Sequence, residues 1–149
     1  MPDNIAFLAA DVGRLFRKRF DVASRQLGIT GPQWRVLAAV DRTPGTNQCA
    51  LANWLEVEAI TVGRMIDRLE KLGMVERRAD PADRRAWLLY LTPAAAPLIE
   101  QLHEFGRGVF HEALDGFSEA EHQQLLSLLQ RVRANLTDEV PTRGRSADG

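Results

Sequence analysis

The chain has 149 residues, 45% of them hydrophobic, and a formal net charge of −1. This composition is ordinary for a globular protein with one packed core, and the charge excludes a histone-like protein that binds nucleic acid through bulk charge. There is no run of eighteen apolar residues and no leader of the charged-then-apolar kind, which predicts a cytoplasmic protein without a membrane partner.

Two helices are predicted before residue 45. Apolar residues recur at helical spacing from Ile5 to Leu27, and Gly28 ends the pattern. A second helix begins near Gly31-Pro32, because proline is tolerated in a first turn, and Pro44-Gly45 breaks it. The first helix is too long to bury its apolar stripe by itself.

The segment from Asn47 to Thr92 predicts a helix, a turn, a second helix and a charged β-hairpin. The second of these helices, from about Ala59 to Leu72, has one apolar face, made by Val62, Met65, Ile66, Leu69 and Leu72. Its opposite face is a polar stripe made by Thr61, Arg64, Arg68 and Lys71. The first turns of a recognition helix enter the major groove of DNA, where arginine pairs with guanine and a threonine methyl meets thymine. The alternative is a solvated face whose basic residues pair with Asp67 and Glu70.

A hairpin is predicted directly after this helix. Gly73 suits a left-handed helix cap, and strands are expected at Val75–Arg78 and Trp87–Leu91, joined by a polar loop over residues 79–85. Arg84 and Arg85 in this loop suit a contact with the minor groove. Asp83 is expected to stabilise the wing by accepting backbone and guanidinium hydrogen bonds. A helix, turn, helix and charged hairpin in this order predict a winged helix-turn-helix that reads DNA.

Two more helices follow the hairpin. Thr92 is expected to cap a fifth helix with Pro93 at its first position, and Ser118 with Glu121 forms a capping box that opens a sixth. The sixth helix is apolar over more than one face, which indicates a partner subunit. Its apolar residues are Leu125, Leu126, Leu128, Leu129, Val132 and Leu136. The tail from Pro141 to Gly149 is expected to be disordered.

Several motifs together resemble the MarR family of bacterial transcription regulators, and within it the SlyA-like branch. They are Leu27–Thr30, Gln33–Leu37, Thr61–Glu70, Gly73–Arg77, and Asp80–Arg85 followed by Leu91-Thr92. The resemblance runs from about Asp11 to about Arg131. It implies a mainly α fold with a small β-hairpin wing, in a single domain over residues 1–140. The DNA-binding lobe would span about 47–92, and N- and C-terminal helices at about 5–27 and 93–137 would form the dimerisation region.

The resemblance also implies how such a protein acts. A homodimer would bind a pseudo-palindromic operator in double-stranded DNA, with the polar stripe in the major groove and Arg84 and Arg85 in the flanking minor groove. A small aromatic carboxylate would modulate or release it, because Arg14, Arg17 and Trp34 fall where SlyA-like proteins contact salicylate-type ligands. From the residues alone, Trp34 also suits a core aromatic, and both arginines suit surface or dimer salt bridges.

Three alternative functions differ in what they require of the sequence. One is a winged-helix protein that binds protein and not DNA, which should lack the basic residues found here. Another is a redox-responsive regulator that uses Cys49, although free cysteine commonly serves as a small core filler. The third is an enzyme, which is not predicted because His103, His111 and His122 lack metal-ligand spacing and no catalytic motif is present. No metal or cofactor is expected.

Overall fold

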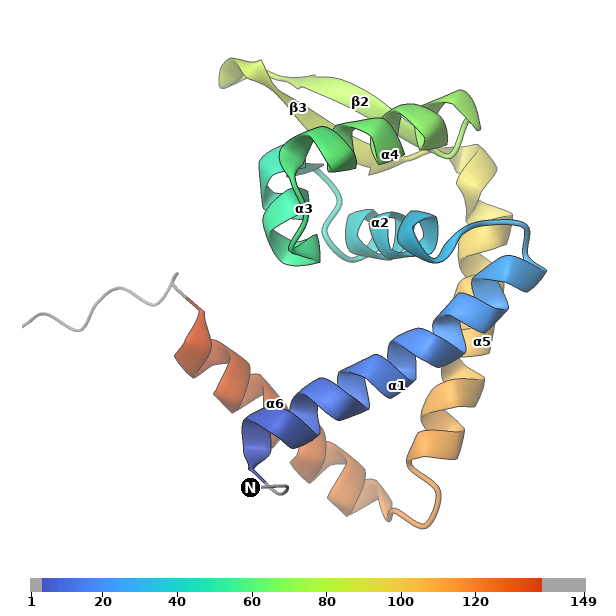
Figure 1. The fold of residues 1–149 in the computed structure, drawn as a ribbon, viewed down its shortest axis with the longest axis vertical. Helices are drawn as coiled ribbons and strands as arrows, with labels where there is room; N and C mark the ends of the chain where they lie inside the picture. Colours follow the sequence, from blue (N-terminus) through green and yellow to red (C-terminus); the bar gives the residue numbers. More distant parts are fainter. Residues whose placement is uncertain (1–3, 138–149) are drawn as a thin grey trace, which may run out of the picture. The chain divides into compact units, whose positions relative to one another are not determined.

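The computed structural model describes residues 4–137, so the predicted disordered tail lies outside the described residues. The chain divides into two compact units, Met1–Val109 and Phe110–Gly149. As predicted, the fold is mainly helical with a small antiparallel sheet. Figure 1 shows the order of the elements.

The first two helices have the predicted positions and defined caps. Helix α1 spans Ile5–Gln26, and the Asn4 side chain accepts a hydrogen bond from the backbone N–H of Phe7. Helix α2 spans Gly31–Arg42 and begins with a capping box formed by Thr30 and Gln33. These bonds satisfy backbone donors that a helix leaves unpaired in its first turn.

A helix-turn-helix follows, formed by α3 (Gln48–Leu55) and α4 (Ala59–Lys71). Between the helices Glu56 adopts a left-handed conformation with a φ of 56°. The Gln48 side chain donates a hydrogen bond of 2.9 Å to the Ala59 carbonyl. Gly63 allows this close approach, because a Cβ there would lie 3.0 Å from the Gln48 amide nitrogen. The turn is therefore held by a side chain from the first turn of α3.

The sheet has the order β1-β3-β2 and is formed by β1 (Thr46–Asn47), β2 (Val75–Asp80) and β3 (Asp83–Leu91). Strand β1 was not predicted, because two residues are too few to show an alternating pattern. The predicted loop over residues 79–85 was wrong, since the strands continue to a two-residue connection, Pro81-Ala82. Asp80 accepts the backbone N–H of Ala82, and Asp83 accepts that of Arg85, both at 2.9 Å. These local bonds stabilise the tight turn.

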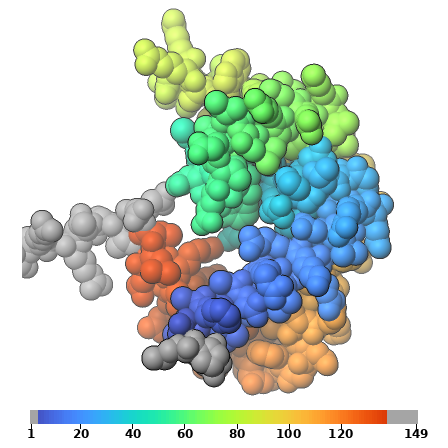
Figure 2. All heavy atoms as spheres, viewed as in Figure 1, coloured from blue at the N-terminus to red at the C-terminus, as the bar shows by residue number. Residues whose placement is uncertain are grey.

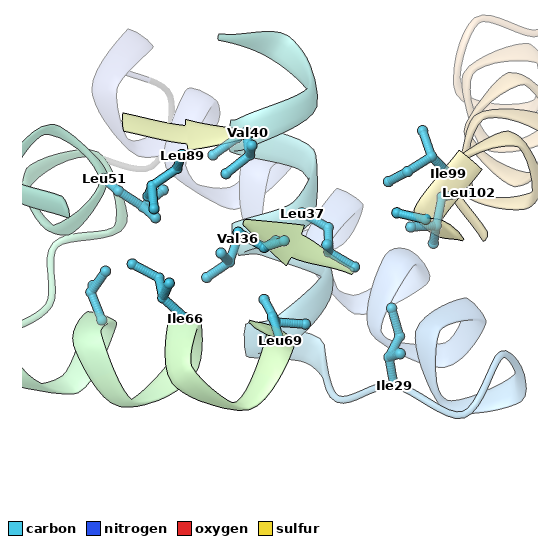
Figure 3. Packing of buried hydrophobic residues seen from close by; sticks show 14 of the residues in the cluster. Ile29, Val36, Leu37, Val40, Leu51, Ile66, Leu69, Leu89, Ile99 and Leu102 are labelled. Carbon is cyan, nitrogen blue, oxygen red and sulfur yellow. The ribbon is translucent and has the colours of Figure 1, made fainter. Parts of the chain in front are cut away.

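The core of the first unit lies where α2, α3, α4 and β3 meet. Figure 3 shows buried side chains from these elements packed against one another, including Val36, Leu37, Val40, Leu51, Ile66, Leu69 and Leu89. Each of these seven is at most 1% exposed. Burial of a large aliphatic side chain contributes about 1.5–3 kcal/mol, so this packing holds the helix-turn-helix and the hairpin together.

The chain after the hairpin corrects one prediction. A short 3₁₀ turn, η1 (Pro93–Ala95), precedes α5 (Ala96–Ala113), and the Thr92 side chain caps neither. The Thr92 hydroxyl instead donates to the Gly73 carbonyl, and its N–H donates to the Met74 carbonyl at 3.0 Å. Thr92 therefore closes the base of the hairpin. The hydroxyl is not available to cap the helix, because it already donates its hydrogen bond at the base of the hairpin.

The second unit contains α6 (Glu119–Leu136), which opens with the predicted capping box of Ser118 and Glu121. The backbone N–H of Ser118, donated to the Glu121 carboxylate, lowers the pKa of that carboxyl. The apolar residues of α6 are exposed, with Leu136 the most exposed of them. An uncovered stripe of this size is unusual on a monomer.

Candidate nucleic-acid interface

Helix α4 has two sharply different faces. Val62, Ile66 and Leu69 are fully buried in the core. The predicted polar stripe of Thr61, Arg64, Arg68 and Lys71 is exposed along its whole length. The buried face fixes the orientation of the helix, so the structure presents these four side chains on one surface.

Arg77 on β2 forms ion pairs with the two acidic residues of α4. Its guanidinium lies 2.7 Å from the Asp67 carboxylate and 3.1 Å from the Glu70 carboxylate. It also donates to the Gly63 carbonyl at 3.4 Å, and its side chain is only 19% exposed. An arginine suits this position, because its guanidinium group can donate hydrogen bonds to two carboxylates at the same time.

This arrangement contradicts the alternative interpretation of the polar stripe, in which its basic residues paired with Asp67 and Glu70. Within residues 4–137, Arg64, Arg68 and Lys71 form no ion pair with any acidic side chain. The acidic partners are taken by Arg77, and the three stripe cations remain directed to solvent.

The role of Arg77 was not predicted from the sequence, although a signal was present. Val75 is buried, and residues two apart on a strand point to the same face. Arg77 therefore lies on the face of β2 that packs toward α4. A basic residue on a core-facing strand position predicts an acidic partner on the element beneath it.

The hairpin tip presents the two predicted arginines. In the register of the hairpin, Asp83 pairs with Asp80 and Trp87 pairs with Ala79, so Arg84, Arg85 and Ala86 have no partner on β2. An extra stretch of this kind bends a strand and redirects its side chains. Both arginines are exposed, and neither forms an ion pair within the described part of the chain. Figure 2 shows the tip standing out from the surface around it.

Asp83 contacts the backbone and not the arginine side chains. Its carboxylate accepts the N–H of Arg85, but the predicted guanidinium hydrogen bond is not formed among the described residues. The carboxylate instead takes part in a local turn with the backbone two residues away. Arg85 thus keeps its charged group free.

The base of the hairpin is braced on its other face. The guanidinium carbon of Arg78 lies 4.1 Å from the centre of the Tyr90 ring, and the same side chain pairs with Glu76. A cation stacked on an aromatic ring and neutralised by a carboxylate is a structural element. Arg78 therefore differs from Arg84 and Arg85, whose charges are not neutralised.

The three residues predicted for ligand binding line one cleft. Arg14 and Arg17 on α1 and Trp34 on α2 border a cavity of about 1030 Å³, together with the α3–α4 turn from Trp54 to Val57. A volume of this size accommodates a small organic ligand. The tertiary structure has brought together residues that are up to twenty positions apart in the sequence.

The alternative roles of these residues are also visible. Trp34 packs on Phe20 with ring centres 4.9 Å apart, and its indole N–H donates to Asp21 at 2.9 Å. Arg14 pairs with Asp11 at 2.8 Å. Arg17 forms no ion pair within residues 4–137. Trp34 is thus both a packed aromatic and part of the cleft lining, and Arg17 and Lys18 are lining cations without an ion pair in the described chain.

The remaining candidate groups lie outside the lining of the cleft. Cys49 is exposed at the second position of α3. His103 lies 2.6 Å from the Asp41 carboxylate, which ties α5 to the end of α2. Among the described residues, no group of three histidine, cysteine or acidic side chains is arranged to hold a metal ion. None of the helices described here is long and apolar enough to span a membrane.

Comparison with known proteins agrees with this geometry. The MarR family model matches residues 29–87. The apo crystal structure of MarR from E. coli is 28% identical over 87% of this chain and 96% of that one, with a TM-score of 0.72. The transcriptional regulator PA3341 is 34% identical over 89% of this chain and 98% of that one, with a TM-score of 0.77.

A third structure contains DNA. It is a Listeria monocytogenes protein assigned to the MarR family of transcriptional regulators and complexed with a 26mer DNA. It is 23% identical over 89% of each chain, with a TM-score of 0.77. At that identity the likeness is one of fold.

Proposed function

The chain belongs to the MarR family of transcriptional regulators, and on that premise we propose that it is a sequence-specific DNA-binding regulator that acts as a homodimer. One observation carries the proposal. Arg77 holds both acidic side chains of α4, so Arg64, Arg68 and Lys71 face solvent without an ion-pair partner in the described chain. Unpaired cations on an exposed helix face are what a phosphate backbone attracts.

In the proposed complex, the first turns of α4 enter the major groove. Arg64 lies one turn into the helix, where a guanidinium reaches the O6 and N7 atoms of guanine. Thr61 contacts a base edge or a phosphate beside it. Arg68 and Lys71, farther along the stripe, contact the phosphates that border the groove.

The hairpin would contact DNA beside the major groove. Arg84 and Arg85 extend from the bulged strand at its tip, and Asp80 and Asp83 hold the turn without neutralising either arginine. A guanidinium is attracted to the narrow minor groove of A·T-rich DNA. A Listeria protein of the same fold has been complexed with a 26mer DNA, which supports DNA binding by a protein of this fold.

We assign the dimer to the N- and C-terminal helices, within the single domain predicted over residues 1–140. The first half of α1 exposes Ile5, Phe7, Leu8, Val12 and Leu15, and α6 exposes its own apolar stripe. A second copy that covers these residues would remove both stripes from water. Two lobes related by a two-fold axis would read half-sites about 10 bp apart, which makes the operator pseudo-palindromic.

A small aromatic acid is the proposed effector, in keeping with the SlyA-like motifs of the sequence. Its carboxylate would pair with Arg17, and its ring would lie against Trp34. The cleft is bordered by α1 and α2 on one side and by the α3–α4 turn on the other. A ligand there contacts the element that positions the recognition helix. A coupling of about 1–3 kcal/mol would change operator affinity several-fold to a hundredfold.

Fluorescence anisotropy against the DNA upstream of the protein's own gene tests the proposal. Wild type should bind in the presence of competitor DNA, with an affinity that falls steeply as salt is raised. Arg64→Ala should lose about 1–3 kcal/mol of discrimination at one base position. Arg107→Ala is the matched control, because Arg107 on α5 is already paired with Glu100 and Glu104. A folded dimer that binds no DNA would instead support the protein-binding winged-helix function.

A further inference from the structure

An isoleucine lies exposed at the start of the recognition helix. Ile60 is the second residue of α4, and 71% of it is exposed to solvent. The neighbouring apolar positions Val62 and Ile66 are fully buried. Ile60 therefore contributes nothing to the core, and an exposed large aliphatic side chain has an unfavourable free energy of hydration unless a partner covers it.

Its position on the helix indicates the partner. Residues four apart on a helix lie one turn apart on the same face, so Ile60 lies directly N-terminal to Arg64. Asp67 and Lys71 continue this face, and the Asp67 carboxylate forms an ion pair with Arg77. Ile60 thus lies at the N-terminal end of the polar stripe, next to Arg64, the side chain that we propose contacts a guanine.

The major groove offers one apolar group, the C5 methyl of thymine. Cytosine in the same position presents a hydrogen, and the purines present polar edges. A branched aliphatic side chain beside an arginine suits a step in which thymine neighbours the guanine that the arginine binds. We propose that Ile60 is a specificity-determining residue that selects thymine by contact with its methyl group. This inference rests on the proposed DNA-binding function and names a base that the site reads.

Thr61 is the competing reader, because its own methyl group also lies in the first turn. The two side chains differ in direction by about 100° around the helix axis. Thr61 lies toward Arg68 on the edge of the stripe, whereas Ile60 lies in line with Arg64. Ile60 therefore contacts the thymine methyl group, and Thr61 makes polar contacts through its hydroxyl group.

Deoxyuridine provides the test, because it lacks only the C5 methyl of thymine. The preferred duplex is first selected from a random pool with wild-type protein, and each thymine is then replaced singly by deoxyuridine. Replacement of one particular thymine in a half-site should weaken wild-type binding about fourfold relative to the unmodified duplex. This is the effect expected from the loss of one buried methyl group. Replacement in both half-sites should multiply the two losses.

Two variants identify the residue responsible. In Ile60→Ala the thymine and deoxyuridine duplexes should bind equally well, whereas in Thr61→Ser the fourfold difference should persist. Ile60 is exposed, so its variant should fold, and circular dichroism checks this. If no thymine is sensitive while wild type still selects a specific duplex, the DNA-binding function stands and this inference is overturned. A difference that persists in Ile60→Ala and disappears in Thr61→Ser overturns it too.

Discussion

The guanidinium of Arg77 lies 2.7 Å from the carboxylate of Asp67, and this pair joins the first strand of the wing to the recognition helix. The same guanidinium holds Glu70. One side chain therefore links the two elements that we propose contact DNA, and its single positive charge offsets one of the two negative charges of the helix. Its removal should affect both stability and DNA binding.

We expect Arg77→Ala to lower the free energy of unfolding by about 1 kcal/mol, since both acidic partners are largely exposed and solvent screens the pairs. Urea unfolding measures this loss. DNA affinity should also fall, because Asp67 and Glu70 are then uncompensated near phosphate groups. The double variant Arg77→Ala with Asp67→Asn should recover part of the affinity but not the stability. Equal affinity for Arg77→Ala and wild type would show that these charges do not face DNA.

We expect Arg85→Ala to weaken operator binding by about 1–3 kcal/mol while the dimer stays folded, because its charged group has no partner in the described chain. The slope of log affinity against log salt should fall by about 1 for each phosphate that the variant no longer neutralises. Arg107→Ala, which removes an arginine away from the wing, is the control. A variant that binds as wild type does would remove the wing from the mechanism.

We expect salicylate to change the fluorescence of the protein, because Trp34 and Trp54 both line the cleft. Arg17→Ala should weaken that binding about 10- to 100-fold, through loss of a charge-assisted hydrogen bond of about 1.5–3 kcal/mol. Arg42→Ala, an exposed position outside the cleft lining, should bind normally. Titration of each variant by tryptophan fluorescence decides this. Unchanged affinity in Arg17→Ala would place the ligand carboxylate elsewhere.

We expect Leu129→Glu to weaken the dimer about thirtyfold, since both copies change and each loses about half of the roughly 2 kcal/mol that full burial of a leucine contributes. Leu129 is half exposed in the single chain, on the same stripe as Leu125 and Val132. Gln130→Glu adds the same charge one position away, on a polar part of the helix, and should leave the dimer intact. Light scattering coupled to size exclusion measures the mass of each. A dimer unaffected by Leu129→Glu would exclude this stripe from the interface.

Much of the fold is determined by local sequence. The capping boxes of Thr30 with Gln33 and Ser118 with Glu121 set helix starts through bonds between residues three apart, so they are readable without tertiary information. The apolar period of α4 predicted the buried Val62, Ile66 and Leu69, although Leu72 after the helix end is exposed. By difference, it also predicted which face carries Thr61, Arg64, Arg68 and Lys71.

Only the tertiary structure decided which charges remain available. Thr92 resembles a helix cap in sequence, yet its hydroxyl bonds to Gly73, a residue nineteen positions away. Asp67 and Glu70 are the nearest acidic residues to the stripe, yet Arg77 takes both from the neighbouring strand. Local patterns determine elements and faces because those depend on backbone geometry within a few residues. The pairing of polar groups between elements depends on distances that exist only after the chain has folded.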